Sequence, residues 1–500
     1  MHEVSQSVAR SLPEVALTAG LLLVVLADAS LARWRARACQ ILTLLTLGSA
    51  LALQITHAGP AGSIWYGMLV RDALGGFFAT LVLGAALLVV AAFTFRNARE
   101  LTGLGRGEFY ALLLAATLAS LLLIAANDLA MLYLALEMLS LSSYVLVAYM
   151  KGDRMSNEAS LKYLLFGAAS TGAMLYGLSL IYGLTGTTRL SAIQQALAAG
   201  LSDANALTLY VAVVFVVAGF GFKTAVVPFH FWCPDAYEGA PTPVTAYLSV
   251  VPKAAGFAIL TRFFFAGLST PLMSAWELAP SVNWPALLMV LSALTMTVGN
   301  VAALTQTNMK RLLAYSSIAH AGYVLMGVVA LSANGAAGVL VYLLSYVVMN
   351  LGAFLVVLLV HKHENTFDLR DYPGLLRRSP WLTAAMSVFL LSLMGIPPLV
   401  GFVGKFYVFA AVIERGSSYY WFAVVGALNA AIAAFYYMRI LKTMVIDAEE
   451  VDAPAKPAVQ LALADRGWLL ALALANFVPV LLWHGVDTWV RHALGLYSGQ

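Results

Sequence analysis

The chain has 500 residues, of which 61% are hydrophobic and only 10% are charged. Soluble domains average about 45–50% apolar and about 25% charged residues, so this composition excludes a soluble globular protein. The net charge of +4 lies in loops without a basic run interleaved with aromatic residues, so nucleic acid is not expected as a partner. Cys39 and Cys233 lie far apart and outside any CxxC or Cys/His pattern, which indicates neither a disulfide framework nor a redox centre in this chain.

Long apolar runs recur along the whole sequence, and none alternates in the manner of a membrane barrel. A helical crossing takes about 20 residues, so the expected fold is an all-α polytopic membrane protein with about 14 transmembrane helices. The first run faintly resembles a signal peptide, but its start is weakly basic and arginines follow it, so a first membrane helix is expected. The expected helices are 12–30, 38–56, 74–95, 108–126, 129–150, 160–184, 206–228, 242–266, 283–304, 311–331, 335–361, 381–412 (interrupted), 420–446 and 468–490.

The loops between these helices differ in charge. Those on one side hold most of the basic residues, among them Arg106, Lys151 and Lys310, and the opposite loops hold few, such as Arg189 and Arg415. The positive-inside rule then predicts a multi-pass protein of the bacterial cytoplasmic (inner) membrane with both termini in the periplasm. No soluble domain interrupts residues 1–500, so a single transmembrane domain is expected.

Glu137 lies near the middle of the fifth predicted helix. Ionisable groups in hydrocarbon are expensive, so they face the bundle interior and are functional candidates. A bare carboxylate there would take up a proton unless a cation lies nearby. Glu137 is therefore expected to take part in proton transfer; the alternative is a carboxylate satisfied by neighbouring Ser or Tyr hydroxyls that only holds helices together.

Two lysines follow in the seventh and eighth helices. Lys223 lies after Gly219 and Gly221 and before Pro228, which removes a backbone donor and breaks the helix. Burial favours a neutral lysine and a nearby carboxylate favours a charged one, so small movements of Glu137 could load or discharge Lys223. Lys253 could face Lys223 and exchange a proton with it, or it could snorkel to the membrane surface.

Lys405 lies in a second broken helix. Residues 395–405 (GIPPLVGFVGK) interrupt the twelfth apolar segment with prolines and glycines and place a lysine at the break. Two such interruptions in corresponding halves are typical of inverted-repeat transporters. The expected repeats are helices four to eight (108–266) and nine to thirteen (283–446), with helices 7 and 12 broken and with 12–95 and 468–490 as peripheral helices.

Three further residues leave alternatives open. Lys162 begins the sixth helix and either links Glu137 to Lys223 or snorkels to the cytoplasmic surface. His230 lies in a proline-rich linker and is either a proton relay or a structural residue. His320 either lines a polar channel or joins helices by hydrogen bonds. No metal site is expected.

With these residues in view, the sequence resembles the antiporter-like membrane subunits of respiratory complex I, the proton-pumping NADH:quinone oxidoreductase, and their cation/proton antiporter relatives. The resemblance covers nearly the whole chain and is most like the N subunits. The twelfth helix bears a lysine, and no long lateral helix is expected after residue 490. The segments that carry the resemblance are 134–144 (LALEMLSLSSY), 221–241 (GFKTAVVPFHFWCPDAYEGAP), 308–317 (NMKRLLAYSS) and 395–405.

The resemblance implies a polar axis through Glu137, Lys223, Lys253 and Lys405 that transports protons within the lipid bilayer. It also implies that other membrane subunits of a hetero-oligomer are the partners, that this chain holds no cofactor, and that NADH, FMN, iron–sulfur clusters and quinone belong to those partner subunits. Two alternatives remain: a component of a Na⁺/H⁺ antiporter that works without a redox partner, and a passive assembly subunit.

Overall fold

The computed structural model describes residues 2–30, 35–57, 61–93, 97–200, 202–272, 275–278, 282–447 and 458–495. The last two residues of the predicted third helix, 94 and 95, lie outside these ranges. Within them, regular structure is helical except for two short antiparallel strand pairs. β1 (Gly62–Ile64) pairs with β2 (Leu69–Arg71), and β3 (Ser269–Leu272) pairs with β4 (Ala275–Leu278). The expected all-α membrane fold is confirmed.

In the part of the chain that the structure describes, 13 helical segments are long and apolar enough to cross a membrane. The remaining predicted crossing, 381–412, consists of two helices of 15 residues each, α16 (Pro380–Met394) and α17 (Val400–Glu414). The helices of the 13 segments are α2 (Leu12–Ser30), α3 (Arg35–Thr56), α4 (Ala73–Ala92), α5 (Gly107–Ala125), α6 (Leu129–Val147), α7 (Arg154–Thr185), α9 (Asp203–Thr224), α11 (Thr242–Arg262), α12 (Trp284–Leu304), α13 (Met309–Val329), α14 (Ala333–Glu364), α18 (Tyr420–Val445) and α19 (Leu463–Ala475) with α20 (Val478–Leu481).

The last predicted helix, 468–490, is wrong as one continuous element. It is divided into α19, α20 and α21 (Trp483–Ala493). Pro479 has no N–H to continue the helix from α19, and α20 restarts with this proline in its first turn. The short helices that the sequence did not predict are α1 (His2–Arg10), α8 (Leu190–Ala198), α10 (Trp232–Gly239) and α15 (Leu375–Arg378).

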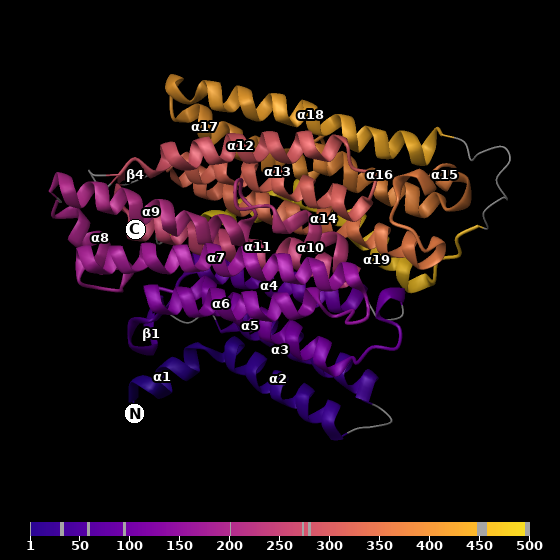
Figure 1. Ribbon diagram of the computed structural model, residues 1–500, viewed down its shortest axis with the longest axis horizontal. Helices are drawn as coiled ribbons and strands as arrows, with labels where there is room; N and C mark the ends of the chain where they lie inside the picture. The colour runs from indigo at the N-terminus through magenta and orange to yellow at the C-terminus, as the bar shows by residue number, and fades with distance from the viewer. Residues whose placement is uncertain are drawn as a thin grey trace.

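The helices form a bundle with a buried centre and two exposed edges. Every residue of α11 is buried, and α13 and α14 are buried along most of their length. In Figure 1, α2 and α3 lie at one edge, α18 lies at the other, and α11, α13 and α14 lie between them. Polar groups on the central helices must therefore find their partners inside the bundle, because bulk water and lipid headgroups are out of reach.

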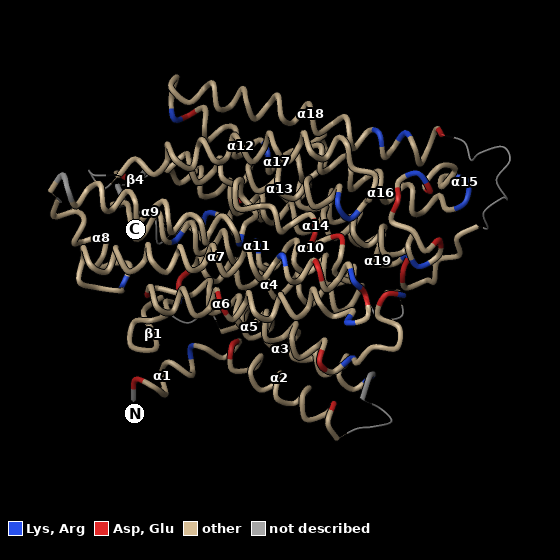
Figure 2. Tube along the Cα trace, viewed as in Figure 1, with Lys and Arg blue, Asp and Glu red and all other residues tan. Residues whose placement is uncertain are grey.

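The two ends of the bundle differ in charge. Figure 2 shows Lys and Arg gathered at the end where α15 and α19 lie, and fewer of them at the end with β1, α8 and β4. Arg10, the last residue of α1, and Trp489 of α21 line one cavity at the second end. Both described ends of the chain therefore lie on the less basic side of the bundle.

Candidate functional site

The predicted break in the seventh helix lies between α9 and α10. α9 ends at Thr224, and Ala225 adopts a left-handed conformation with φ of +60°. The freed carbonyls find partners: Val226 N donates to Gly221 O at 2.7 Å, and the Trp232 indole donates to Phe222 O at 3.0 Å. Lys223 thus lies in the last turn of a helix, where the macrodipole favours a positive charge.

Lys223 is buried against α6 and α11. Its ammonium donates to Ser140 Oγ at 3.1 Å. Glu137 lies one turn before Ser140 on α6 and acts electrostatically on the ammonium. No ion pair of 4.0 Å or less joins the two described side chains, and Glu137 Oε1 is buried without a hydrogen-bond partner. The hydroxyls of neighbouring Ser and Tyr therefore do not satisfy this oxygen.

Lys253 lies on the fully buried helix α11, directly after Pro252. Its ammonium donates to the main-chain carbonyl of Ser317 at 3.1 Å and to the Ser317 hydroxyl. With an exposure of 3%, it does not reach the membrane surface, so the snorkelling alternative is wrong. The ammonium groups of Lys223 and Lys253 share no hydrogen-bond partner among the described residues. The aliphatic part of the Lys223 side chain packs at Gly256, one turn along α11 from Lys253.

His320, for which the sequence left two roles open, lies close to the partner of Lys253. It follows Ser317 by one turn on α13, and its ring nitrogens bond the Tyr342 hydroxyl at 2.8 Å and the Tyr437 hydroxyl at 3.1 Å. The charges of both Lys253 and Lys405 act on its imidazole. His320 therefore joins α13 to α14 and α18 and lies within electrostatic reach of two lysines. The helical spacing from Ser317 was the available signal, but the sequence does not show where Lys253 ends.

Lys405 lies on α17 beside the second break. Its ammonium donates to Leu393 O at 3.1 Å and to Met394 O at 2.7 Å, the last carbonyls of α16. It also lies 5.1 Å from the centre of the Tyr323 ring. Gly395 has φ of +85°, and a Cβ there would come within 2.7 Å of Lys405 Cδ, so glycine is needed both for the turn and for the lysine.

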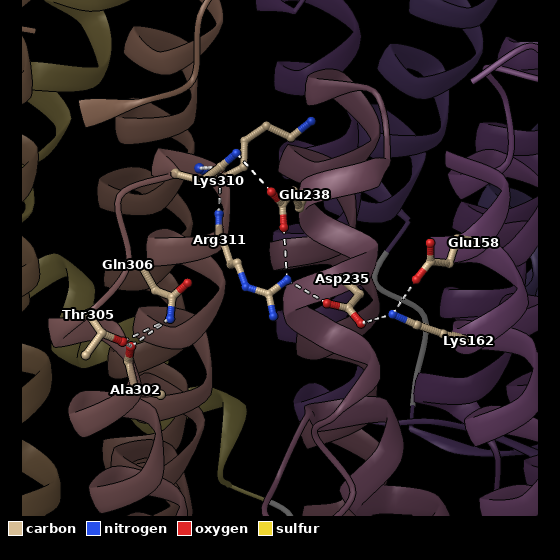
Figure 3. A network of polar contacts seen from close by, with 10 residues as sticks. Glu158, Lys162, Asp235, Glu238, Ala302, Thr305, Gln306, Lys310 and Arg311 are labelled. Atoms are coloured by element: carbon tan, nitrogen blue, oxygen red, sulfur yellow. Dashed lines mark hydrogen bonds and ion pairs between the residues drawn. The ribbon is translucent and has the colours of Figure 1, made fainter. Parts of the chain in front are cut away.

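Lys162 lies in a different network, shown in Figure 3. Its ammonium pairs with Glu158 at 2.7 Å and with Asp235 at 2.8 Å. Arg311 bridges Asp235 at 2.6 Å and Glu238 at 2.9 Å. The Lys162 side chain is 41% exposed, and none of its described partners is Glu137 or Lys223. Burial opposes ionisation of Asp235, but hydrogen bonds from Lys162 and Arg311 hold its pKa below the usual value.

Two other residues differ from their expected surroundings. His230 is buried in the α9–α10 break, and its Nδ1 has no hydrogen-bond partner. Lys310, which the sequence places among the exposed loop residues, is buried: it donates to Ala240 O at 2.6 Å and lies 3.6 Å from Glu100. The described chain holds no group of three or more His, Cys, Asp or Glu side chains that could bind a metal ion.

Residues 126–432 match the family described as NADH:quinone oxidoreductase/Mrp antiporter, TM. The chain is 46% identical to NADH-quinone oxidoreductase subunit N of Anaeromyxobacter sp. (strain Fw109-5), over 97% of this chain and 96% of the relative. It is 40% identical to subunit N of Chlorobium chlorochromatii, over 99% and 96%.

Among solved structures, a chain of respiratory complex I from Thermus thermophilus is similar, with a TM-score of 0.78, 33% identity and coverage of 95% of this chain and 98% of that one. A chain of the Mrp complex from Dietzia sp. DQ12-45-1b shares the fold, with a TM-score of 0.82, 21% identity and coverage of 98% and 97%. The chain belongs to the family of NADH:quinone oxidoreductase and Mrp antiporter membrane subunits and is a subunit N member of it.

Proposed function

We propose that this chain translocates protons across the membrane as the N-type subunit of an NADH:quinone oxidoreductase, along Glu137, Lys223, Lys253, His320 and Lys405. The observation that carries the proposal is how the three lysines of this path, Lys223, Lys253 and Lys405, are held. Each ammonium is hydrogen-bonded to neutral oxygens, and none forms an ion pair within the described chain. Such a lysine can gain or lose its proton without leaving a buried carboxylate unpaired.

Glu137 is the group that controls the first lysine. Its approach to Lys223 favours the charged lysine, and its withdrawal favours the neutral one because burial penalises charge. A neighbouring subunit that moves α6 would therefore load or discharge Lys223. One proton moved against about 150 mV stores about 3.5 kcal/mol. Bringing two unit charges to about 4 Å at an effective dielectric constant of about 20 is worth about 4 kcal/mol, so the movement is sufficient in size.

From Lys223, the proposed path follows α11 and α13 to the second break. The stem of Lys223 packs at Gly256, Lys253 bonds Ser317, and His320 stands one turn further along α13. Because His320 feels the charge of both Lys253 and Lys405, protonation of either lysine changes the proton affinity of its neighbour. Water chains complete the path between these groups and to both membrane surfaces.

Further features belong to the same proposal. α5 to α11 and α12 to α18 form two inverted repeats, and α16 with α17 completes one crossing. The chain lies in the bacterial cytoplasmic membrane with both termini in the periplasm. It assembles with other membrane subunits, and NADH, FMN, iron–sulfur clusters and quinone are held by its partner subunits. Those partners drive this chain, which takes no part in electron transfer itself.

The test is NADH-driven proton pumping in membrane vesicles that contain Lys223→Ala. Assembly is checked on a native gel, and NADH oxidation is measured with an artificial acceptor. We expect pumping to be lost in an assembled complex that still oxidises NADH. Lys442→Ala is the matched control, because that lysine is 64% exposed at the end of α18. Unchanged pumping would overturn the role of Lys223, and loss of assembly with intact pumping per complex would favour a passive assembly subunit.

The Na⁺/H⁺ antiporter alternative has weaker support, since the Mrp chain is 21% identical and shows a shared fold alone. A sodium gradient imposed without NADH distinguishes the two. An antiporter component would acidify or alkalinise the vesicle lumen under this gradient, whereas a subunit driven by quinone reduction needs NADH.

A further inference from the structure

A large cavity lies at the less basic end of the bundle, and none of the lysines of the proposed path lines it. Its volume is about 900 Å³, and it is lined by α3, α4, α21 and the end of α1. The polar part of the wall contains Arg10, Gln54, His57, Arg71 and His492. The apolar part includes Ile55, Phe77 and Trp489. Cationic and amide groups thus meet apolar surface in one cavity.

The position of Arg10 is fixed by its backbone, while its side chain has no described partner. The carbonyl of Arg10 accepts a hydrogen bond from Arg71 Nε at 2.8 Å. Ser7 and Ser11, on either side of Arg10, accept hydrogen bonds from Trp65 after β1. The Arg10 guanidinium itself forms no described hydrogen bond or ion pair, and it packs over Gly62. A fixed backbone therefore holds an uncompensated positive charge at the cavity.

The other charges around the cavity are already paired. Arg71 bonds Glu14 at 2.9 Å and Gln54 Oε1 at 2.9 Å. Both oxygens of Asp72 accept from Arg262, and one of them also accepts from the amide of Gly75. Although burial opposes ionisation, the Arg262 guanidinium holds the pKa of Asp72 below its usual value, so this carboxylate stays charged and paired. The free hydrogen-bonding groups at the cavity are mainly donors, which favours an anionic ligand.

The apolar wall of the cavity indicates which kind of anionic ligand fits. Gly76 and Thr80 lie one turn apart on α4, so the cavity wall continues along the helix axis toward the membrane interior. Phe77 contacts Trp489 of α21 with ring centres 4.3 Å apart. Tryptophan is enriched where membrane helices meet the headgroup layer. A soluble phosphate would use the donors and leave the apolar wall wet, whereas a phospholipid uses both.

We propose that this cavity binds one anionic phospholipid, with its phosphate at Arg10, Gln54 and His57 and an acyl chain along Ile55 and the α4 face at Gly76 and Thr80. Charge-assisted hydrogen bonds from a guanidinium to phosphate are the strong ones, which makes Arg10 the main determinant. The bound lipid joins the first helices to α21, because both line the same cavity.

The experiment uses the assembled complex in vesicles that contain phosphatidylglycerol or phosphatidylcholine with a photoreactive group, followed by mass spectrometry of the labelled peptides. We expect phosphatidylglycerol to label residues 54–57 and 76–80 preferentially. In Arg10→Gln, this preference falls by about tenfold, as loss of one charge-assisted hydrogen bond predicts. Thr80→Phe, which fills the apolar end and keeps every charge, also lowers labelling. Arg415→Gln is the matched control, because Arg415 is a partly exposed arginine of a predicted periplasmic loop outside this cavity.

Three outcomes overturn the proposal. Equal labelling by the two lipids shows ordinary contact with the bilayer. A phosphatidylglycerol preference that persists in Arg10→Gln places the lipid elsewhere. Loss of labelling in the presence of excess inorganic phosphate shows a site for a soluble anion.

Discussion

The two broken helices hold their lysines in different ways. Lys223 precedes its break and donates to a side-chain hydroxyl, with the Glu137 carboxylate nearby. Lys405 follows its break and donates to two main-chain carbonyls at the end of α16, and no acidic side chain in the described part of the chain pairs with it. A side chain can rotate away, whereas the end of a helix moves only with the helix. The first break is therefore suited to receive a signal, and the second is suited to hold a proton until the half-helices move.

Replacement of Lys405 by arginine gives the largest expected effect and separates proton transfer from structural support. Arginine keeps the positive charge at the α16 carbonyls but does not release its proton. We expect Lys405→Arg to lower NADH-driven pumping at least about tenfold in an assembled complex, and we expect the same of Lys405→Met. Pumping at the wild-type rate in the arginine variant would mean that Lys405 only fastens the second break. The same pair of variants at Lys223 tests the first break.

Gly395 tests how tightly the second break is built around its lysine. An alanine there would be strained at φ of +85° and would also meet Lys405 Cδ at 2.7 Å. Gly186 ends α7 with φ of +68°, and a Cβ added there would meet no atom within 4 Å, so Gly186→Ala carries the backbone strain alone. We expect about 1–2 kcal/mol of destabilisation at Gly186 and more at Gly395, measured by thermal unfolding of the complex. Equal losses would show that Lys405 moves aside freely.

Substitution of Ser140 tests the hydroxyl that accepts the hydrogen bond from Lys223. Ser140→Ala removes the acceptor of Lys223, and loss of such a bond is worth about 1–1.5 kcal/mol, or up to about tenfold in pumping rate. Ser143 is the matched control: it is buried one turn away and bonds its own helix, Leu139 O at 2.6 Å, as Ser140 bonds Leu136 O at 2.8 Å. Equal effects of the two substitutions would show that only α6 packing had been disturbed.

The sequence revealed the charged groups more readily than their partners. Glu137, Lys223 and Lys405 stand out because ionisable residues in apolar segments are rare, and prolines and glycines mark both breaks. The partner of Lys253 could not be inferred in this way. α11 is buried on every side, so its apolar pattern does not indicate which face points to α13, and Ser317 lies 64 residues away.

The sequence also does not show which residues at the ends of helices are exposed and which are buried in the bundle. Lys310 stands directly before a predicted helix and Lys162 stands at the start of one, yet the first is buried and the second is 41% exposed. Lys310 is covered by Ala240 and Glu100, which lie far from it in the sequence, and local composition does not show this. Hydropathy indicates whether a segment enters the membrane, but it does not show which other part of the chain covers the end of that segment.

Substitution of Lys162 gives the smallest expected effect on proton pumping, because Lys162 lies outside the proposed path. Its ion pairs with Asp235 and Glu158 are partly exposed, and such pairs are worth about 0–1 kcal/mol. We expect Lys162→Ala to leave pumping unchanged and to lower the thermal stability of the complex slightly.

The pKa of Asp235 is lowered in the folded chain, so the stability from this network is present at neutral pH and is lost as the pH falls through that lowered pKa. The stability difference between wild type and Asp235→Asn should therefore shrink on acidification. A loss of pumping in Lys162→Ala at neutral pH would contradict the expectation of unchanged pumping. It would place Lys162 on the proton path to Lys223 and would mean that this path reaches the surface through Lys162.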